Sequence, residues 1–242
     1  IYIPRMLDHA YALAAAFKRC NVNAEVLPET DRTIVDLGKR YLSGKECYPC
    51  TITTGHILKK ISEPDFIPDK SAFFMPTANG PCRFGQYHVL QDLMLKELGY
   101  KDVIMVAPEQ HSNTFKEIGI ENGKEFIKVA WHGIVAFDIL YKCLHESRPY
   151  EKEQGISDEL FAKYRDIICS ALMNRNGTLE DVMKRMKNDF ENIPKYKEKK
   201  PVVGIVGEIF VRCHNFSNEN LIRKIESLGG EAWLAPFGEW IY

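Results

Sequence analysis

The sequence lacks the features that mark membrane, secreted and nucleic-acid-binding proteins. It has no uninterrupted apolar run of about 18 residues, which a transmembrane helix needs, and no secretory signal pattern. Its 32 basic and 33 acidic residues give a formal net charge of -1. Such a balance indicates no basic surface for nucleic acid or anionic lipid. We therefore expect a cytoplasmic protein with neither nucleic-acid nor membrane partners.

Nucleotide-binding motifs are also missing. The chain contains neither a Walker-type phosphate loop nor a Rossmann G-x-G-x-x-G motif. Its 242 residues, 45% of them hydrophobic and 27% charged, have an ordinary globular composition. The sequence therefore predicts folded domains that carry no nucleotide site of their own.

Cysteine is present in an odd number and scattered along the chain. The seven cysteines are Cys20, Cys47, Cys50, Cys82, Cys143, Cys169 and Cys213. This distribution does not suit a small secreted scaffold held by disulfides. In a reducing compartment, clustered cysteines are more often metal ligands or catalytic groups.

In the first half of the chain, short continuous apolar runs typical of buried strands alternate with stretches in which apolar residues repeat at helical spacing. The expected strands are residues 24–27, 72–75 and 103–106, and the expected helices are residues 8–19, 31–42, 51–61 and 84–98. Because the strands are continuously apolar, they predict a parallel sheet with helices on both faces. The fold class is therefore α/β, of the Rossmann-like type.

The pattern changes twice further along the chain. Residues 124–189 give only helical periods, and the α/β pattern restarts after Pro201 with strands at 202–206 and 232–234 and a helix at 218–228. We expect a first Rossmann-like domain over residues 1–122 that carries the cysteine loops. A helical segment and linker over 123–200 follows, and then the truncated start of a second α/β domain over 201–242.

Two Gly/Pro-rich stretches bring cysteines to the starts of expected helices. The first is residues 44–50 (Gly-Lys-Glu-Cys-Tyr-Pro-Cys), and the second is residues 76–87, which includes Cys82 and Arg83. Helix N-termini favour thiolate over thiol, and open α/β sheets bind ligands at the carboxyl ends of their strands. We expect the two loops to meet and Cys47, Cys50 and Cys82 to hold an iron–sulfur cluster.

Other interpretations of these residues stay open. Cys47 and Cys50 form a C-x-x-C motif that also suits a redox dithiol. A structural zinc site would need a fourth ligand, which His56 or His88 could supply. The cysteines could also be incidental to Gly/Pro turns.

The remaining candidates lie beside these loops or elsewhere in the chain. Arg83 could pair with an anionic cluster or an acyl-CoA phosphate, or lie on the solvated surface. Cys213 follows the restarted strand and is a possible further ligand. Cys20, Cys143 and Cys169 fall at helical positions suited to packing.

The two cysteine stretches, together with residues 206–212 (Val-Gly-Glu-Ile-Phe-Val-Arg), resemble a known family. They look like the region that accompanies CoA-substrate-specific enzyme activases, which are related to the 2-hydroxyacyl-CoA dehydratase system of anaerobes. The resemblance covers essentially the whole chain, and both cysteine motifs are long and specific.

The resemblance implies a [4Fe-4S] cluster held between Rossmann-like domains by three cysteines. One ligand comes from a loop like that of Cys47 and Cys50, one from a loop like that of Cys82, and the third from late in the second domain. We expect that third ligand beyond Tyr242, so that the cluster is absent or incomplete in this chain.

The resemblance also implies partners. ATPase modules of the same longer chain, or a separate activator, would hydrolyse ATP to drive an electron to low potential, and acyl-CoA would be the substrate. The predicted function is the iron–sulfur component of such a dehydratase-like or activase-related system. A non-catalytic electron-transfer or docking module and a C-x-x-C dithiol protein are the alternatives.

Overall fold

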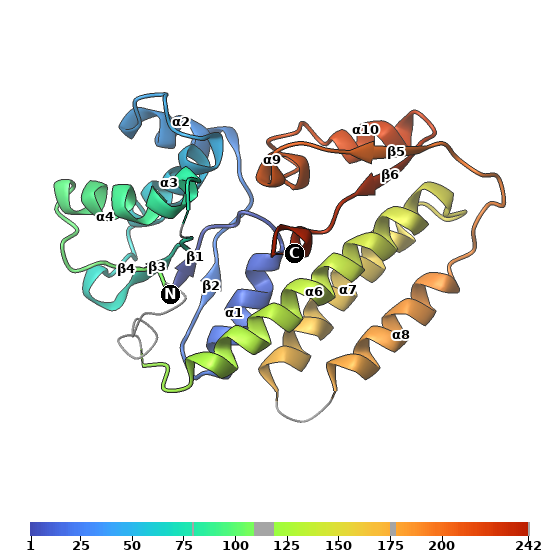
Figure 1. Ribbon diagram of the computed structural model, residues 1–242, viewed down its shortest axis with the longest axis horizontal. Helices are drawn as coiled ribbons and strands as arrows, with labels where there is room; N and C mark the ends of the chain where they lie inside the picture. Colours follow the sequence, from blue (N-terminus) through green and yellow to red (C-terminus); the bar gives the residue numbers. More distant parts are fainter. Residues whose placement is uncertain (79, 109–118, 175–177, 242) are drawn as a thin grey trace. The chain divides into compact units, whose positions relative to one another are not determined.

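A computed structural model describes residues 1–78, 80–108, 119–174 and 178–241 (Figure 1). The chain forms two compact units. Unit 1 comprises Ile1–Met6 and Cys20–Phe126, and unit 2 comprises Leu7–Arg19 and the chain from Ile127 onward. The segment 7–19 thus belongs to unit 2, although the chain on both sides of it belongs to unit 1.

Unit 1 is built on a four-stranded parallel sheet. Its strands are β1 (Tyr2–Ile3), β2 (Glu25–Val26), β3 (Ala72–Phe74) and β4 (Ile104–Val106). They lie in the order β2-β1-β3-β4, and all neighbouring pairs are parallel. The predicted α/β class with a parallel sheet is therefore confirmed.

Helices flank this sheet. They are α2 (Arg32–Tyr41), α3 (Tyr48–Ile61) and α4 (Tyr87–Glu97). Apolar side chains of the strands, the loops and helices α3 and α4 form one buried core, made of Leu27, Ile57, Leu58, Ile61, Phe73, Met94, Leu95 and Val103. Asp31 caps α2 by accepting a hydrogen bond from the Ile34 N–H (2.9 Å).

Helices α2 and α3 approach each other closely through two glycines. A Cβ atom on Gly38 would lie 2.0 Å from the Thr51 carbonyl oxygen, and one on Gly55 would lie 1.9 Å from the Ile34 carbonyl oxygen. Any larger residue would force the two backbones apart, because real Cβ contacts are not that short. This crossing fixes the position of α3, whose first turn carries Cys50.

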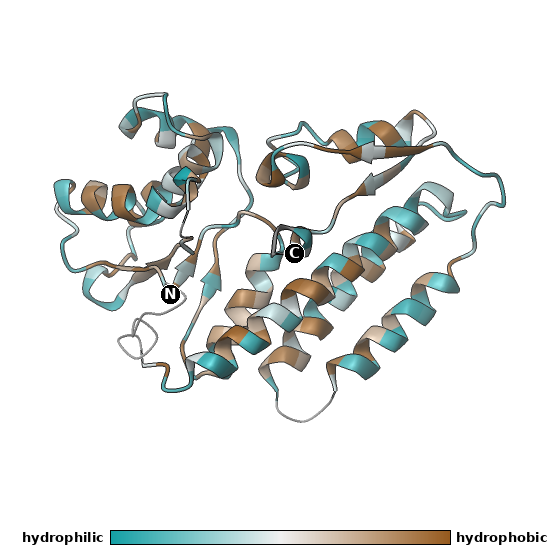
Figure 2. Cartoon of the chain, viewed as in Figure 1, coloured by the Kyte–Doolittle hydropathy of each residue, from teal (hydrophilic) through white to brown (hydrophobic). Residues whose placement is uncertain are grey.

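Unit 2 contains the long helices. They are α1 (His9–Arg19), α6 (Gly123–Ser147, whose first turn belongs to unit 1), α7 (Ile156–Met173) and α8 (Leu179–Glu191). Helix α8 is hydrophilic over most of its surface (Figure 2) and buries Val182, Met186 and Phe190 at a spacing of four residues. Thr178 caps this helix by accepting a hydrogen bond from the Asp181 N–H.

The α/β pattern restarts in unit 2 as predicted. Strands β5 (Val202–Ile205) and β6 (Glu231–Leu234) are parallel, and the helices beside them are α9 (Ile209–Cys213) and α10 (Leu221–Ser227). Ile205, Ile222 and Ala232 form the core between α10 and the two strands. The expected helix over 218–228 is shorter than predicted, because Asn218 accepts from the Leu221 N–H (3.1 Å) and so precedes the helix start.

Buried charges connect α10 to the rest of unit 2. The Arg148 guanidinium binds both carboxylate oxygens of Glu226 (2.8 Å each), and its third nitrogen binds Asp158 at 3.0 Å. The side chains of Arg148 and Glu226 are 8% and 9% exposed. Arg223 also binds both oxygens of Asp158. In the part of the chain that the structure describes, no helix has the length and apolar character needed to cross a membrane.

Candidate functional site

The first cysteine loop leads directly into helix α3. Cys47 is the N-cap residue, and α3 begins at Tyr48. The expectation that the helix starts at residue 51 is therefore wrong, because Cys50 lies in the first turn and its N–H donates to the Cys47 carbonyl (2.9 Å). Pro49 suits this turn, where a missing backbone N–H costs nothing.

Glu46 holds the start of this loop. Its carboxylate accepts hydrogen bonds from the Ser43 hydroxyl (2.9 Å), the Ser43 N–H (3.3 Å) and the Gly44 N–H (3.0 Å). Hydrogen bonds from its own N–H and from the Ser43 hydroxyl lower the pKa of the Glu46 carboxyl. The residue before Cys47 is thus fixed by local contacts.

The second cysteine loop ends in a 3₁₀ helix. Cys82 is exposed and is the N-cap of η2 (Arg83–Gln86), which runs into α4. The single helix expected from residue 84 therefore begins as a 3₁₀ turn. The Thr77 hydroxyl donates to the Gly85 carbonyl (3.1 Å) and closes the loop on itself. Asn79, part of the predicted motif, lies outside the described residues.

The two loops meet, as the sequence predicts. The Arg83 guanidinium of the second loop donates to the Lys45 carbonyl of the first (2.8 Å). Burial, together with hydrogen bonding to Cys47 and the nearness of Cys50 and Cys82, raises the pKa of the Tyr87 hydroxyl on α4 well above its usual value. One tyrosine is therefore within electrostatic reach of all three predicted cysteines.

Cys50 is the buried member of the group, at 1% exposed. It packs in a small apolar cluster with Met75 and Tyr87. Burial raises the pKa of the Cys50 thiol to about 11, against the opposing effect of a hydrogen bond from the Thr54 hydroxyl. Without a metal ion or another cation, Cys50 is thus a protonated thiol at neutral pH.

His56 and His88 are the two histidines considered as a fourth zinc ligand. His56 is buried and its Nε2 lies 3.1 Å from the Thr30 hydroxyl. His88 has a buried Nδ1 with no hydrogen-bond partner among the described residues. No group of three or more His, Cys, Asp or Glu side chains in the described ranges is arranged to hold a metal ion.

Cys213 lies in unit 2, whereas Cys47, Cys50 and Cys82 lie in unit 1. It is the last residue of α9 rather than part of a loop directly after the strand. It lines a small cavity of about 30 Å³ together with His9, Asp138 and His145. Burial raises the pKa of the Cys213 thiol to about 11.

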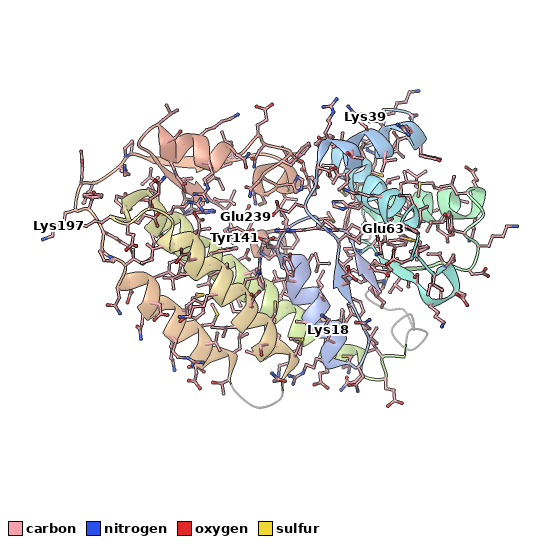
Figure 3. The ribbon with its side chains drawn as sticks, turned by 180° about the vertical axis from the view of Figure 1, so that it is seen from behind. Lys18, Lys39, Glu63, Tyr141, Lys197 and Glu239 are labelled. Carbon is pink, nitrogen blue, oxygen red and sulfur yellow. The ribbon has the colours of Figure 1, made fainter. Side chains whose placement is uncertain are left out.

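The polar pair in this cavity was not predicted from the sequence. His9 Nε2 lies 2.9 Å from Asp138, whose two carboxylate oxygens also accept from the Phe237 and Gly238 N–H groups (2.8 Å each). Tyr141, labelled in Figure 3, stacks on His9 and donates to Asp8 at 2.6 Å. His9 and Asp138 are 129 residues apart, so no local spacing could have joined them.

The remaining cysteines behave as packing residues. Cys143 and Cys169 are partly buried within α6 and α7, and burial raises the pKa of each thiol, to about 11 for Cys169. Cys20 directly follows α1. That these three cysteines pack rather than ligate stays a prediction.

Comparisons of the chain with protein-family models, with curated proteins and with solved structures found no match. The residues of the two loops and their contacts therefore carry the inference of function.

Proposed function

We propose that unit 1 carries the iron–sulfur site of a low-potential electron-transfer system related to the activases and dehydratases that the sequence resembles. The observation that carries this proposal is the meeting of two cysteine loops, joined by the hydrogen bond from Arg83 to the Lys45 carbonyl. Cys47, Cys50 and Cys82 supply thiolate ligands, the donor type that iron–sulfur clusters take. Such a cluster supplies single electrons at low potential.

The chemistry of the three side chains supports a cluster. Thiolates of a cluster surround several irons, so they need not converge on one ion as the ligands of a zinc ion do. Cys47 and Cys82 are each the residue that precedes a helical turn. Free backbone N–H groups at such turns favour a negatively charged ligand.

Arg83 has two roles in this proposal. Its hydrogen bond to Lys45 ties the loops together. Its guanidinium also places a positive charge one residue from Cys82, where it offsets the negative charge of a cluster or pairs with the phosphate of an acyl-CoA substrate. ATPase modules, in the same polypeptide or in a separate activator, would deliver the electron.

Anaerobic reconstitution of the full-length protein with iron and sulfide tests the proposal. We expect iron and sulfide in near-equal amounts and, after reduction, the EPR spectrum of a [4Fe-4S]⁺ cluster. Cys47→Ser and Cys50→Ser each lower the iron content, whereas Cys169→Ser, which removes a packing thiol of α7, leaves it unchanged. Equal iron contents in all four proteins would contradict the proposal.

A redox dithiol is the second candidate, and one observation favours it. Cys47 at the N-cap and Cys50 in the first turn of α3 have the placement of C-x-x-C pairs at helix N-termini. In this function the iron-free chain forms a reversible Cys47–Cys50 disulfide in glutathione buffers and takes up no iron. The contact with the Cys82 loop has no role there, so the cluster is the better-supported function.

A further inference from the structure

The surface around the two cysteine loops carries an excess of positive charge. Its exposed cations are Lys39 and Arg40 in the last turn of α2, Lys45 in the first loop and Arg83 in the second. Lys39 is labelled in Figure 3. The hydrogen bond from the Arg83 guanidinium to the Lys45 carbonyl (2.8 Å) joins the two loops. We call these four side chains the basic surface of unit 1.

Little negative charge balances the basic surface. Residues 38–50 and 76–87 contain one acidic side chain, Glu46, and its carboxylate already accepts hydrogen bonds from Ser43 and Gly44. None of the four cations forms an ion pair with a described residue. The whole chain has 32 basic and 33 acidic residues, so the excess of positive charge is local.

Local helix stability accounts for only two of these cations. Lys39 and Arg40 lie at the C-terminus of α2, where the helix dipole favours positive charge. Lys45 lies in a loop, and Arg83 is the first residue of a 3₁₀ turn, the end at which the dipole favours negative charge. Arg83 uses one nitrogen for the Lys45 carbonyl, which is an uncharged acceptor. The charges of Lys45 and Arg83 are therefore available to a partner.

Two exposed tyrosines accompany the basic surface. Tyr41 ends α2 and is 49% exposed, and Tyr48 begins α3 and is 37% exposed. Tyrosine and arginine are the side chains most enriched at protein–protein interfaces. Sites for small molecules are concave and bury most of their ligand, whereas these side chains are exposed. The surface therefore suits a protein partner better than a small anion.

Cations beside aromatic side chains also occur in proteins that bind single-stranded nucleic acid. Nucleic-acid-binding domains are basic overall, while this chain has a formal net charge of -1. The remaining acidic surface would repel a long polyanion but not a short acidic segment. The charge of the whole chain therefore favours an acidic segment of a protein.

We propose that the basic surface of unit 1 binds an acidic segment of a partner protein, with Tyr41 and Tyr48 as its apolar contacts. The cations attract and orient the segment, and the tyrosines contribute affinity through the area that they bury. A segment bound there lies beside Cys47 and Cys82, which directly precede Tyr48 and Arg83. The proposal holds whatever these cysteines bind.

Fluorescence anisotropy of a labelled peptide of alternating glutamate and leucine residues tests the surface. The matched control is the other lysine-rich stretch, residues 195–200, which contains four lysines and the exposed Tyr196. We expect the double variant Arg40→Glu/Lys45→Glu to weaken binding by about tenfold, while Lys197→Glu/Lys199→Glu stays near the wild-type value. Equal losses in the two double variants, or no binding of the peptide to the wild type at low salt, would overturn the proposal.

A second comparison leaves the charge unchanged. We expect Tyr41→Ser to weaken binding of the same peptide by about threefold, while Tyr196→Ser binds it as the wild type does. Wild-type affinity in Tyr41→Ser would show that charge attraction alone holds the peptide, which overturns the proposed surface.

A labelled thymidine oligonucleotide with the same number of charges as the peptide tests the kind of partner. We expect it to bind more weakly than the peptide, and tighter binding would overturn the assignment to a protein partner. None of these measurements needs iron, so they stand if the iron–sulfur function fails.

Discussion

The guanidinium of Arg148 is almost fully buried, at 8% exposed, and binds the carboxylates of Glu226 and Asp158. Removing one partner from a buried ion pair leaves the other charge without compensation, which costs more than the pair itself contributes. The contacts of Arg148 join the segment after α6 to both α7 and α10. Arg148 therefore links three segments of unit 2 through buried contacts.

We expect Arg148→Met to lower the free energy of unfolding by about 3 kcal/mol, because Glu226 is left buried and unpaired. Lys184→Met is the matched control. It breaks the solvent-exposed pair with Glu180 on α8 and is expected to leave the free energy of unfolding close to the wild-type value. Urea unfolding curves of both variants at pH 7 measure the difference. Equal losses in the two proteins would contradict a structural role for the buried pair.

For single residues, the sequence identified the cysteines that are candidate ligands but not the side chains that contact them. The Gly/Pro-rich stretches around Cys47 and Cys82 predicted two segments that meet through Arg83 and Lys45, but Cys50 lies in the first turn of α3 rather than in a loop. From the sequence, Tyr87 and Gln91 could be assigned only to a predicted helix, because their contacts depend on how α4 packs against α3. Their polar atoms reach the site across helix–helix contacts that no local period encodes.

The crossing of α2 and α3 positions the first turn of α3 and hence Cys50. Gly38 and Gly55 bring the two backbones close enough that a Cβ atom at either position would overlap a carbonyl oxygen of the other helix. Helix propensity alone would favour alanine at both positions. Packing therefore overrides propensity at this crossing.

We expect Gly55→Ala to destabilise unit 1 by about 1–3 kcal/mol, as overpacking does, and to move the start of α3. Lys39→Ala, at an exposed position of α2 labelled in Figure 3, keeps near wild-type stability. Thermal unfolding monitored by circular dichroism compares the two variants. A stabilised Gly55→Ala protein would show that the helices can separate without cost.

Among the elements, the longer ones were predicted well and the shorter ones poorly. Helices α6, α7 and α8 occupy the stretch that the sequence predicts to be purely helical, because each repeats its apolar period over several turns. Strand β1 has two residues and α9 has five. Elements of that length complete no apolar period, so tertiary packing decides where they form.

At the scale of the whole molecule, a buried imidazole makes the stability of unit 2 depend on pH. Burial, together with the positive charges of Arg148 and Arg223, lowers the pKa of His145 to about 3. Histidine in an unfolded chain has a pKa of about 6.5. Between these two values the unfolded state binds one more proton than the folded state, so stability falls as the pH is lowered.

We expect the free energy of unfolding to drop by about 2 kcal/mol from this group between pH 6.5 and pH 4.5, since each pH unit is worth at most about 1.4 kcal/mol and the unfolded histidine is only half protonated at pH 6.5. His145→Phe and His145→Asn lack the titrating group, so both should flatten this part of the pH profile despite their different sizes. Urea titrations at several pH values measure the slopes. If both variants keep the wild-type slope of unfolding free energy against pH, His145 does not cause this pH dependence.

The central claim is that the loop of Cys82 and the loop of Cys47 and Cys50 form one iron–sulfur site. The most direct test is the iron content of Cys82→Ser after anaerobic reconstitution, measured beside the wild type and Cys169→Ser. We expect Cys82→Ser to lose most of its iron and the EPR signal of the cluster, while Cys169→Ser keeps both. Wild-type iron content and an unchanged spectrum in Cys82→Ser would contradict it.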